Sequence, residues 1–218
     1  MAARRDPQAI LTAALAGLAF ILFVPLFLFS RLGPLDFWWS LTLNVLTLSG
    51  LALIFDGDCR ATVRSDVLIR PLPKVLKGAI SAVALYLVFV AAGALARQIL
   101  PWRAGQDIGR VYALKAGLSS SRIFFSLLLV IGPGEEIFWR AFLQNRAQAY
   151  WGRRPGWLAA SALYTAVHLG SGNPLLLGAA AVGGLFWGYL YLRCRSIVLN
   201  AVSHTLWDLV IFLIRPVG

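Results

Sequence analysis

The side chains in this sequence whose types and spacing could do chemistry are few, and they all lie in apolar surroundings. Six ionisable residues fall within hydrophobic segments: Glu135, Glu136, Arg140, His168, His204 and Asp208. The chain has only two histidines, and both belong to this set. Because an ionisable group at membrane depth is energetically unfavourable, such residues by default mark a functional site in which they have partners.

The two adjacent glutamates are predicted to have different roles. Glu136 and Arg140 are four residues apart, so on a helix they share a face and can form an ion pair. Glu135 lies about 100° round the helix from Glu136, away from that arginine. A buried carboxylate without a cationic partner is suited to act as a general base toward water.

The two histidines fit the same scheme. His168 could hold or deprotonate a water molecule beside Glu135. His204 and Asp208 are four residues apart, with Asn200 one turn earlier on the same face, and they could face a developing oxyanion. The reaction class that these residues indicate is attack of water on an acyl carbon, with amide hydrolysis as the natural case.

The composition indicates that this chemistry takes place in a membrane. Of 218 residues, 59% are hydrophobic and 13% are charged, whereas globular chains average about 45–50% apolar and about 25% charged residues. The mean hydropathy is +0.75. The net charge of +11 is spread over the connections between apolar runs, which is typical of loops at an anionic membrane surface. No basic stretch is interleaved with aromatic residues, which argues against nucleic acid as a partner.

The apolar runs predict an all-α, polytopic transmembrane helix bundle of about seven spans, within a range of six to eight. We expect spans at 9–29, 37–55, 78–95, 123–131, 157–167, 175–192 and 196–214. The third and fourth spans are joined by a mixed loop in which we expect a surface helix at about 108–118. The Gly-Pro-Gly sequence at 132–134 is predicted to interrupt the fourth helix, because proline lacks a backbone donor and clashes one turn back. A second helix is then expected from Pro133 to about Trp151, with both glutamates near its start.

The basic residues predict the orientation. Thirteen of the 20 Lys and Arg residues, Arg4 and Arg5 among them, fall on the side of the N-terminus. The positive-inside rule then places the N-terminus in the cytoplasm, and the make-up of the chain suggests a bacterial inner (plasma) membrane. We expect one membrane domain, with N-terminal spans and an amphipathic loop at 1–120 and the catalytic core at 121–218. Cys59 and Cys194 do not form a metal-type pair and are predicted to be free thiols.

Three motifs in this order resemble the CPBP family. These are the CAAX-processing and bacteriocin-processing membrane proteases, also called Abi, and they include the type II CAAX prenyl endopeptidase. The resemblance covers about residues 121–214, and the three motifs together are specific although each is weak by itself. They are Glu135-Glu136-x-x-x-Arg140, Tyr164-x-x-x-His168 and His204-x-x-x-Asp208.

The resemblance implies that Glu135 activates water with His168 beside it, and that Glu136 and Arg140 form the supporting pair. It also implies that His204 acts on the oxyanion side.

Asp208 stands where prenyl-processing members carry asparagine, and an ionised aspartate cannot donate a hydrogen bond to an oxyanion. Either Asp208 is protonated, or His204 donates while Asp208 orients it, or Asn200 supplies an amide.

Members of the family have been described both as metalloproteases and as glutamate-dependent proteases. Glu135, His168 and His204 could make a three-ligand catalytic zinc site. However, the sequence contains no H-E-x-x-H motif, and the two histidines lie on different helices. We therefore predict a metal-free glutamate mechanism without a cofactor, and keep zinc as the alternative.

The predicted function is that of an intramembrane endopeptidase, with a peptide or protein substrate in the lipid bilayer. The substrate is expected to be a membrane-associated protein or one that bears a C-terminal signal. A non-catalytic bacteriocin-immunity or chaperone-like membrane protein is the first alternative. A proton-coupled transporter ranks last, because the sequence predicts one broken helix and has no internal repeat.

Overall fold

Short polar side chains set where the helices begin in the computed structural model, which describes residues 6–217. Asp36 accepts hydrogen bonds from the backbone N–H groups of the first turn of α2 (Phe37–Phe55). Asp56 caps α3 (Gly57–Leu68) in the same way, Asn173 caps α10 (Pro174–Cys194), and Ser196 caps α11 (Ile197–Leu209). These caps satisfy donors that a helix start leaves free.

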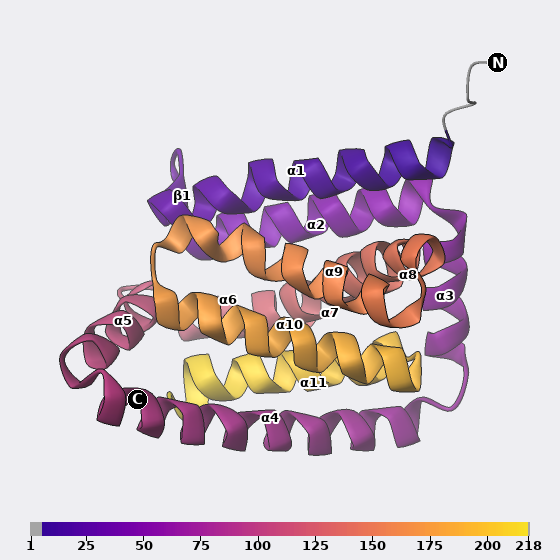
Figure 1. The fold of residues 1–218 in the computed structure, drawn as a ribbon. Coiled ribbons are helices and arrows are strands. Elements are labelled where there is room, and N and C mark those ends of the chain that lie inside the picture. The colour runs from indigo at the N-terminus through magenta and orange to yellow at the C-terminus, as the bar shows by residue number, and fades with distance from the viewer. Residues whose placement is uncertain (1–5, 218) are drawn as a thin grey trace.

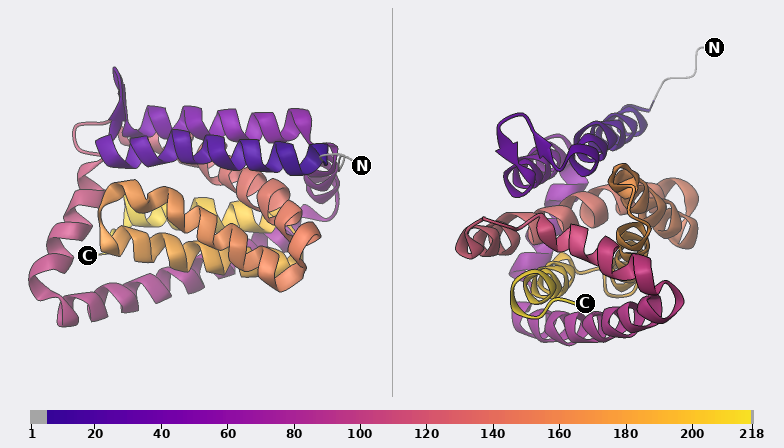
Figure 2. Two further views of the ribbon diagram at one scale, coloured as in Figure 1. Left: turned by 45° about the horizontal axis from the view of Figure 1, so that its top comes forward. Right: turned by 90° about the vertical axis from the view of Figure 1, so that its left-hand side faces the viewer.

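The helices run back and forth between two ends of the molecule (Figure 1). At one end lie α3 and the start of α1 (Pro7–Phe29); at the other lie α5 (Pro101–Ala113) and a small hairpin of β1 (Arg31–Leu32) and β2 (Leu35–Asp36). We call these the α3 end and the α5 end. Helices α1 and α2 form one side, and α4 (Pro71–Ile99) covers the opposite side (Figure 2). Between them lie α9 (Arg153–Ala166), α10, α11 and the helical run of 120–151, which we call the central run.

The central run is continuous, so the predicted interruption at 132–134 is wrong. It consists of α6 (Ser120–Ser126), the π-helix η1 (Leu127–Ile131), α7 (Gly132–Glu136), the π-helix η2 (Ile137–Gln144) and α8 (Asn145–Trp151). The Gly132 N–H donates to the carbonyl of Leu127, five residues back. This wider turn comes just before Pro133, where one ladder donor is missing, and the backbone stays right-handed helical through Ile137.

The two glycines beside Pro133 allow close helix packing instead of breaking the helix. A Cβ added at Gly132 would overlap Thr205 Oγ1 of α11, and one added at Gly134 would overlap Val45 Cγ1 of α2. The central run therefore lies closer to both neighbours than any larger residue would permit.

The structure confirms the predicted all-α membrane bundle, with an approximate span count. Five helices are long and apolar enough to cross a membrane among the described residues: α1, α2, α4, α10 and the run of α11 with the π-helix η4 (Val210–Ile214). Large apolar side chains are exposed along these helices, as expected for an integral membrane protein facing lipid. The predicted spans at 123–131 and 157–167 are not among the five. The first is part of the charged central run, and α9 has only 14 residues.

Other boundaries differ from the prediction. Helix α4 is longer than the predicted span at 78–95, and the amphipathic helix α5 begins and ends before the predicted 108–118. The polar segment after α2 contains α3, which was not predicted.

Arg4 and Arg5, which were used to predict the orientation, lie outside the described residues. The division into 1–120 and 121–218 stays a prediction.

We expect Gly134→Ala to destabilise the protein by about 1–3 kcal/mol, because the added methyl group overpacks the contact with Val45. Thermal unfolding of the purified protein in detergent measures this. Gly50→Ala, in α2 where a Cβ meets nothing within 4 Å, is the control and should not destabilise. Val45→Ala should rescue Gly134→Ala; no rescue would contradict the packing argument.

Candidate active site

The six predicted site residues come from three separate segments, and the structure brings them together in two layers. Glu135, His168, His204 and Asp208 line one cavity. Glu136 and Arg140 lie behind them, with no exposed surface. The glutamates are on α7, Arg140 is on η2, His168 is on the 3-10 helix η3 (Val167–Ser171), and His204 and Asp208 are on α11.

The buried layer is organised around the Glu136 carboxylate. Arg140 Nε donates to Glu136 Oε2 at 3.3 Å, and Asn200 Nδ2 donates to the same oxygen at 2.9 Å. His204 Nδ1 lies 2.8 Å from Glu136 Oε1. The Arg140 guanidinium also lies over the ring of Tyr164, 5.3 Å from its centroid. One carboxylate thus links the central run to α11 through two side chains.

Asn200 has no donor left for a substrate. Its Nδ2 group donates to Glu136 Oε2 and, at 2.7 Å, to the carbonyl of Trp187. An amide nitrogen carries two hydrogens, and both are used here. This argues against the alternative in which Asn200 stabilises the oxyanion.

His204 is held from three sides. Its Nδ1 faces Glu136, its ring stacks on Trp187 with centroids 3.7 Å apart, and its Nε2 lies 3.6 Å from Asp208 Oδ2. The last distance is too long for a hydrogen bond, so Asp208 is a close acidic neighbour of His204 and not its hydrogen-bond partner.

The tautomer of His168 follows from its partner. Nδ1 lies 2.8 Å from the carbonyl oxygen of Tyr164, and because a carbonyl can only accept, Nδ1 carries the hydrogen. In the neutral ring Nε2 is then a free acceptor. The ring also packs against Phe27 of α1 at a centroid distance of 4.4 Å, so the N-terminal spans help to orient it.

The cavity has a volume of about 400 Å³, and its walls are mostly apolar. Residues of α4, α5 and the first half of α10 line it, which places it toward the α5 end. Glu135 Oε2 has no hydrogen-bond partner among the described residues. The Glu135 side chain lines the same cavity as the ring of His168.

Two aromatic residues of the site were not predicted. Trp187 lies in a glycine-rich span that the sequence identifies only as a packing helix, and Phe27 lies in the first span, outside the motifs. Each is conspicuous only through its contact with a histidine.

The described residues do not form the set of ligands that the zinc alternative requires. In the part of the chain that the structure describes, no three His, Cys, Asp or Glu side chains are grouped as a metal site requires. His204 Nδ1 and His168 Nδ1 are both taken by hydrogen bonds. The metal-free mechanism stays a prediction.

The comparisons with known proteins agree with the motifs. Residues 118–210 match the family described as Type II CAAX prenyl endopeptidase Rce1-like. This segment is a little under half of the chain and contains all six predicted site residues. No curated protein and no solved structure matches the chain.

We expect Arg140→Ala to destabilise the protein by about 3–5 kcal/mol, because it leaves the fully buried Glu136 without its cation. Yield in the membrane fraction and thermal unfolding in detergent measure this. Glu135→Gln is the control, since the Oε2 atom that it replaces has no partner to lose. If Arg140→Ala unfolds at the temperature of the control, the ion pair does not support the fold.

Proposed function

We propose, from the premise that residues 118–210 belong to the CAAX family of membrane proteases, that this protein is a glutamate-dependent intramembrane endopeptidase. Membership implies a protease that acts on a protein substrate in the membrane. The mechanism, the site residues and the side of cleavage are our proposal. The observation that carries it is that Glu135 lines a mostly apolar cavity together with both histidines, whereas the cation Arg140 is paired with the neighbouring Glu136.

In the proposed reaction, water bound between Glu135 and His168 loses a proton to the Glu135 carboxylate. The water oxygen attacks the carbonyl carbon of the scissile peptide bond, and the carbonyl oxygen becomes an oxyanion. When the C–N bond breaks, the proton on Glu135 passes to the leaving amine. Atoms and charges balance without any further reactant.

His204 is the proposed donor to the oxyanion. Both amide hydrogens of Asn200 are already donated, and an ionised Asp208 cannot donate. Its Nδ1 is engaged with Glu136, so Nε2–H is the group that can stabilise the charge that develops in the transition state.

The walls of the cavity indicate the kind of substrate. Apolar side chains of α4, α5 and α10 surround the polar site, among them Phe89, Ile108 and Leu175. This favours a substrate whose residues next to the scissile bond are apolar, as in a membrane-associated protein or a C-terminal signal near the membrane surface.

The location of the cavity indicates the side of cleavage. It extends toward the α5 end, whereas the α3 end carries more Lys and Arg residues. Under the positive-inside rule the α3 end is cytoplasmic. We therefore propose that the substrate is cut near the non-cytoplasmic face.

We expect Glu135→Gln to lower cleavage by about 100-fold or more, because the general base is lost, while thermal stability stays unchanged. The C-termini of membrane and secreted proteins, read by mass spectrometry in the native host, identify the product. Tyr150→Phe, at a position that does not line the cavity, is the control and should still cleave. A product that persists in Glu135→Gln contradicts the mechanism, and loss of the product with a zinc chelator would favour the metal alternative.

We expect a membrane-impermeant maleimide to label Cys194 only after the membrane is permeabilised. Cys194 is exposed at the α3 end and Cys59 is buried, so Cys194 is the native reporter. In a Cys194→Ser background, Ser119→Cys, exposed at the α5 end, should be labelled in intact cells. The reverse pattern refutes the orientation but leaves the proposed protease activity untouched.

A further inference from the structure

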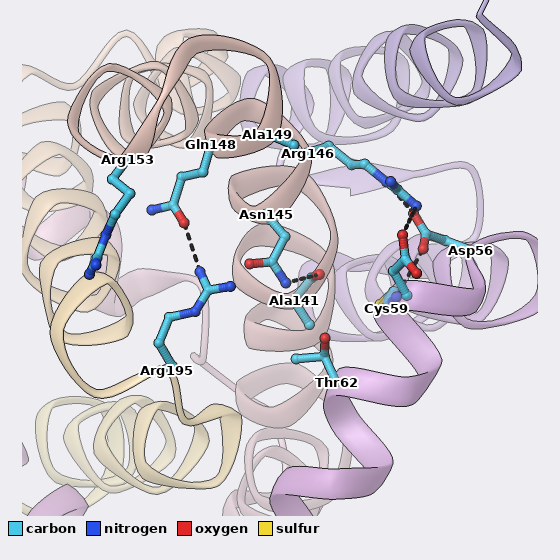
Figure 3. A pocket seen from close by; sticks show the side chains of 11 residues that line it. Asp56, Cys59, Thr62, Ala141, Asn145, Arg146, Gln148, Ala149, Arg153 and Arg195 are labelled. Carbon is cyan, nitrogen blue, oxygen red and sulfur yellow. Dashed lines mark hydrogen bonds and ion pairs between the residues drawn. The ribbon is translucent and has the colours of Figure 1, made fainter.

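A second cavity lies at the α3 end, away from the candidate active site (Figure 3). Its volume is about 510 Å³, within the range of small-molecule sites. It is lined by α3, by α8 at the end of the central run, by the start of α9 and by the turn between α10 and α11. None of its lining residues takes part in the proposed proteolysis.

One wall of this cavity carries acidic residues that are already neutralised. Arg146 binds Asp56 at 2.6 Å and Asp58 at 3.1 Å. Burial acts to raise the pKa of Asp56, but hydrogen bonds from Arg146 and from the Cys59 N–H outweigh it, so that this pKa lies below its ordinary value. The wall is therefore a closed network of ionised groups that needs no ligand.

The opposite wall carries positive charge without a carboxylate to balance it. Arg153 Nη2 donates to the carbonyl of Leu192, and Arg195 Nη1 donates to Gln148 Oε1, both at 2.8 Å. Neither arginine has an acidic partner within the described residues, and Gln148 Nε2 also lacks a partner there. Figure 3 shows Arg153 and Arg195 on one side of the cavity, across from Asp56 and Arg146. This side offers hydrogen-bond donors fixed in place by neutral oxygens.

The cavity has no reactive group that would suggest catalysis. Burial and the neighbouring Asp56 raise the pKa of the Cys59 thiol to about 12, so it stays protonated and is neither a nucleophile nor a metal ligand. Thr62 and Asn145 add neutral polar groups. Because it has no reactive group and contains two arginines without an acidic partner among the described residues, the cavity is suited to bind an anion.

We propose that this cavity binds the phosphate group of an anionic phospholipid, with Arg153 and Arg195 as its cationic ligands. The planar guanidinium group matches two phosphate oxygens at once. The membrane-spanning helices α1, α2, α4, α10 and α11 all begin or end at this end of the molecule, which places the cavity at the depth of the lipid headgroups. The same end is cytoplasmic under the positive-inside rule, and anionic lipids are enriched in that leaflet.

The test is lipid binding by the full-length protein, and it does not depend on proteolysis. Wild type purified in detergent is offered equal amounts of phosphatidylglycerol and phosphatidylcholine, and the bound lipids are counted by native mass spectrometry. We expect a preference for phosphatidylglycerol that falls by about tenfold or more in Arg153→Gln/Arg195→Gln, because two charge-assisted hydrogen bonds are lost.

The control variant is Arg154→Gln/Arg193→Gln. It removes the same charge from the adjacent positions, which do not line the cavity, and it should keep the preference. Thermal unfolding without lipid checks that both variants fold. If the glutamine variant does not fold, Arg153→Lys/Arg195→Lys replaces it, and it should reduce the preference several-fold because lysine lacks the bidentate geometry.

The outcomes distinguish the proposal from its rivals. Absence of a preference in wild type, or an equal loss in the control variant, overturns it. Titration with inorganic phosphate separates the two possible sources of the anion. If phosphate alone stabilises wild type but not Arg153→Gln/Arg195→Gln, and phosphatidylglycerol has no effect, the ligand is a soluble phosphate and the lipid is excluded. Binding of an acidic peptide in place of phosphatidylglycerol overturns the proposal too.

Discussion

The rest of this structure depends on one buried charge, the carboxylate of Glu136. Moving an ion of this size from water into a medium of low polarity is unfavourable by about 20 kcal/mol in an idealised estimate, so the fold must supply partners. Arg140 comes from the same helical run, whereas His204 and Asn200 come from α11. The requirement to neutralise one residue therefore fixes the register of two helices that are far apart in the sequence.

That constraint also positions the residue beside it. Consecutive residues on a helix point about 100° apart, so while Glu136 faces its partners, Glu135 is turned to the cavity. The π-helical turns on either side of α7 are of a kind that often occurs at functional sites. Together with the tight contacts of Gly132 and Gly134, they let a proline-containing helix pass through the centre of the bundle without a break. The packing of the central run therefore positions both Glu135, which lines the cavity, and Glu136, which lies behind it.

The two cavities that contain polar residues lie toward opposite ends of the bundle. The cavity with the ionisable site lies toward the α5 end within apolar walls, and the cavity with Arg153 and Arg195 lies at the α3 end, which carries more basic residues. The central run contributes Glu135 to the first cavity and Asn145 and Gln148 to the second. One helix therefore connects the chemistry of the site to the surface that meets the lipid headgroups.

Much of the fold could be predicted from the sequence, and so could the six ionisable residues that the structure brings together. The second span was predicted with its observed bounds of Phe37–Phe55, and the first, sixth and seventh within a few residues, because hydropathy over one helix length is a local property. The six ionisable residues stand out for the same reason, since each is conspicuous against its own apolar segment. Their one-turn spacing also predicts the Glu136–Arg140 pair, which lies within a single helical run.

The tertiary structure alone decided the features that depend on neighbours distant in the sequence. Glycine and proline at 132–134 predict a break, but the contacts with Thr205 and Val45 and the wider turn at Leu127 keep the helix continuous. Likewise, nothing in the sequence around Asn200 indicates that its two amide hydrogens are donated to Glu136 and Trp187. A pattern of residue types states which groups must be satisfied, but only the packing of separate helices determines which partner lies within hydrogen-bonding distance.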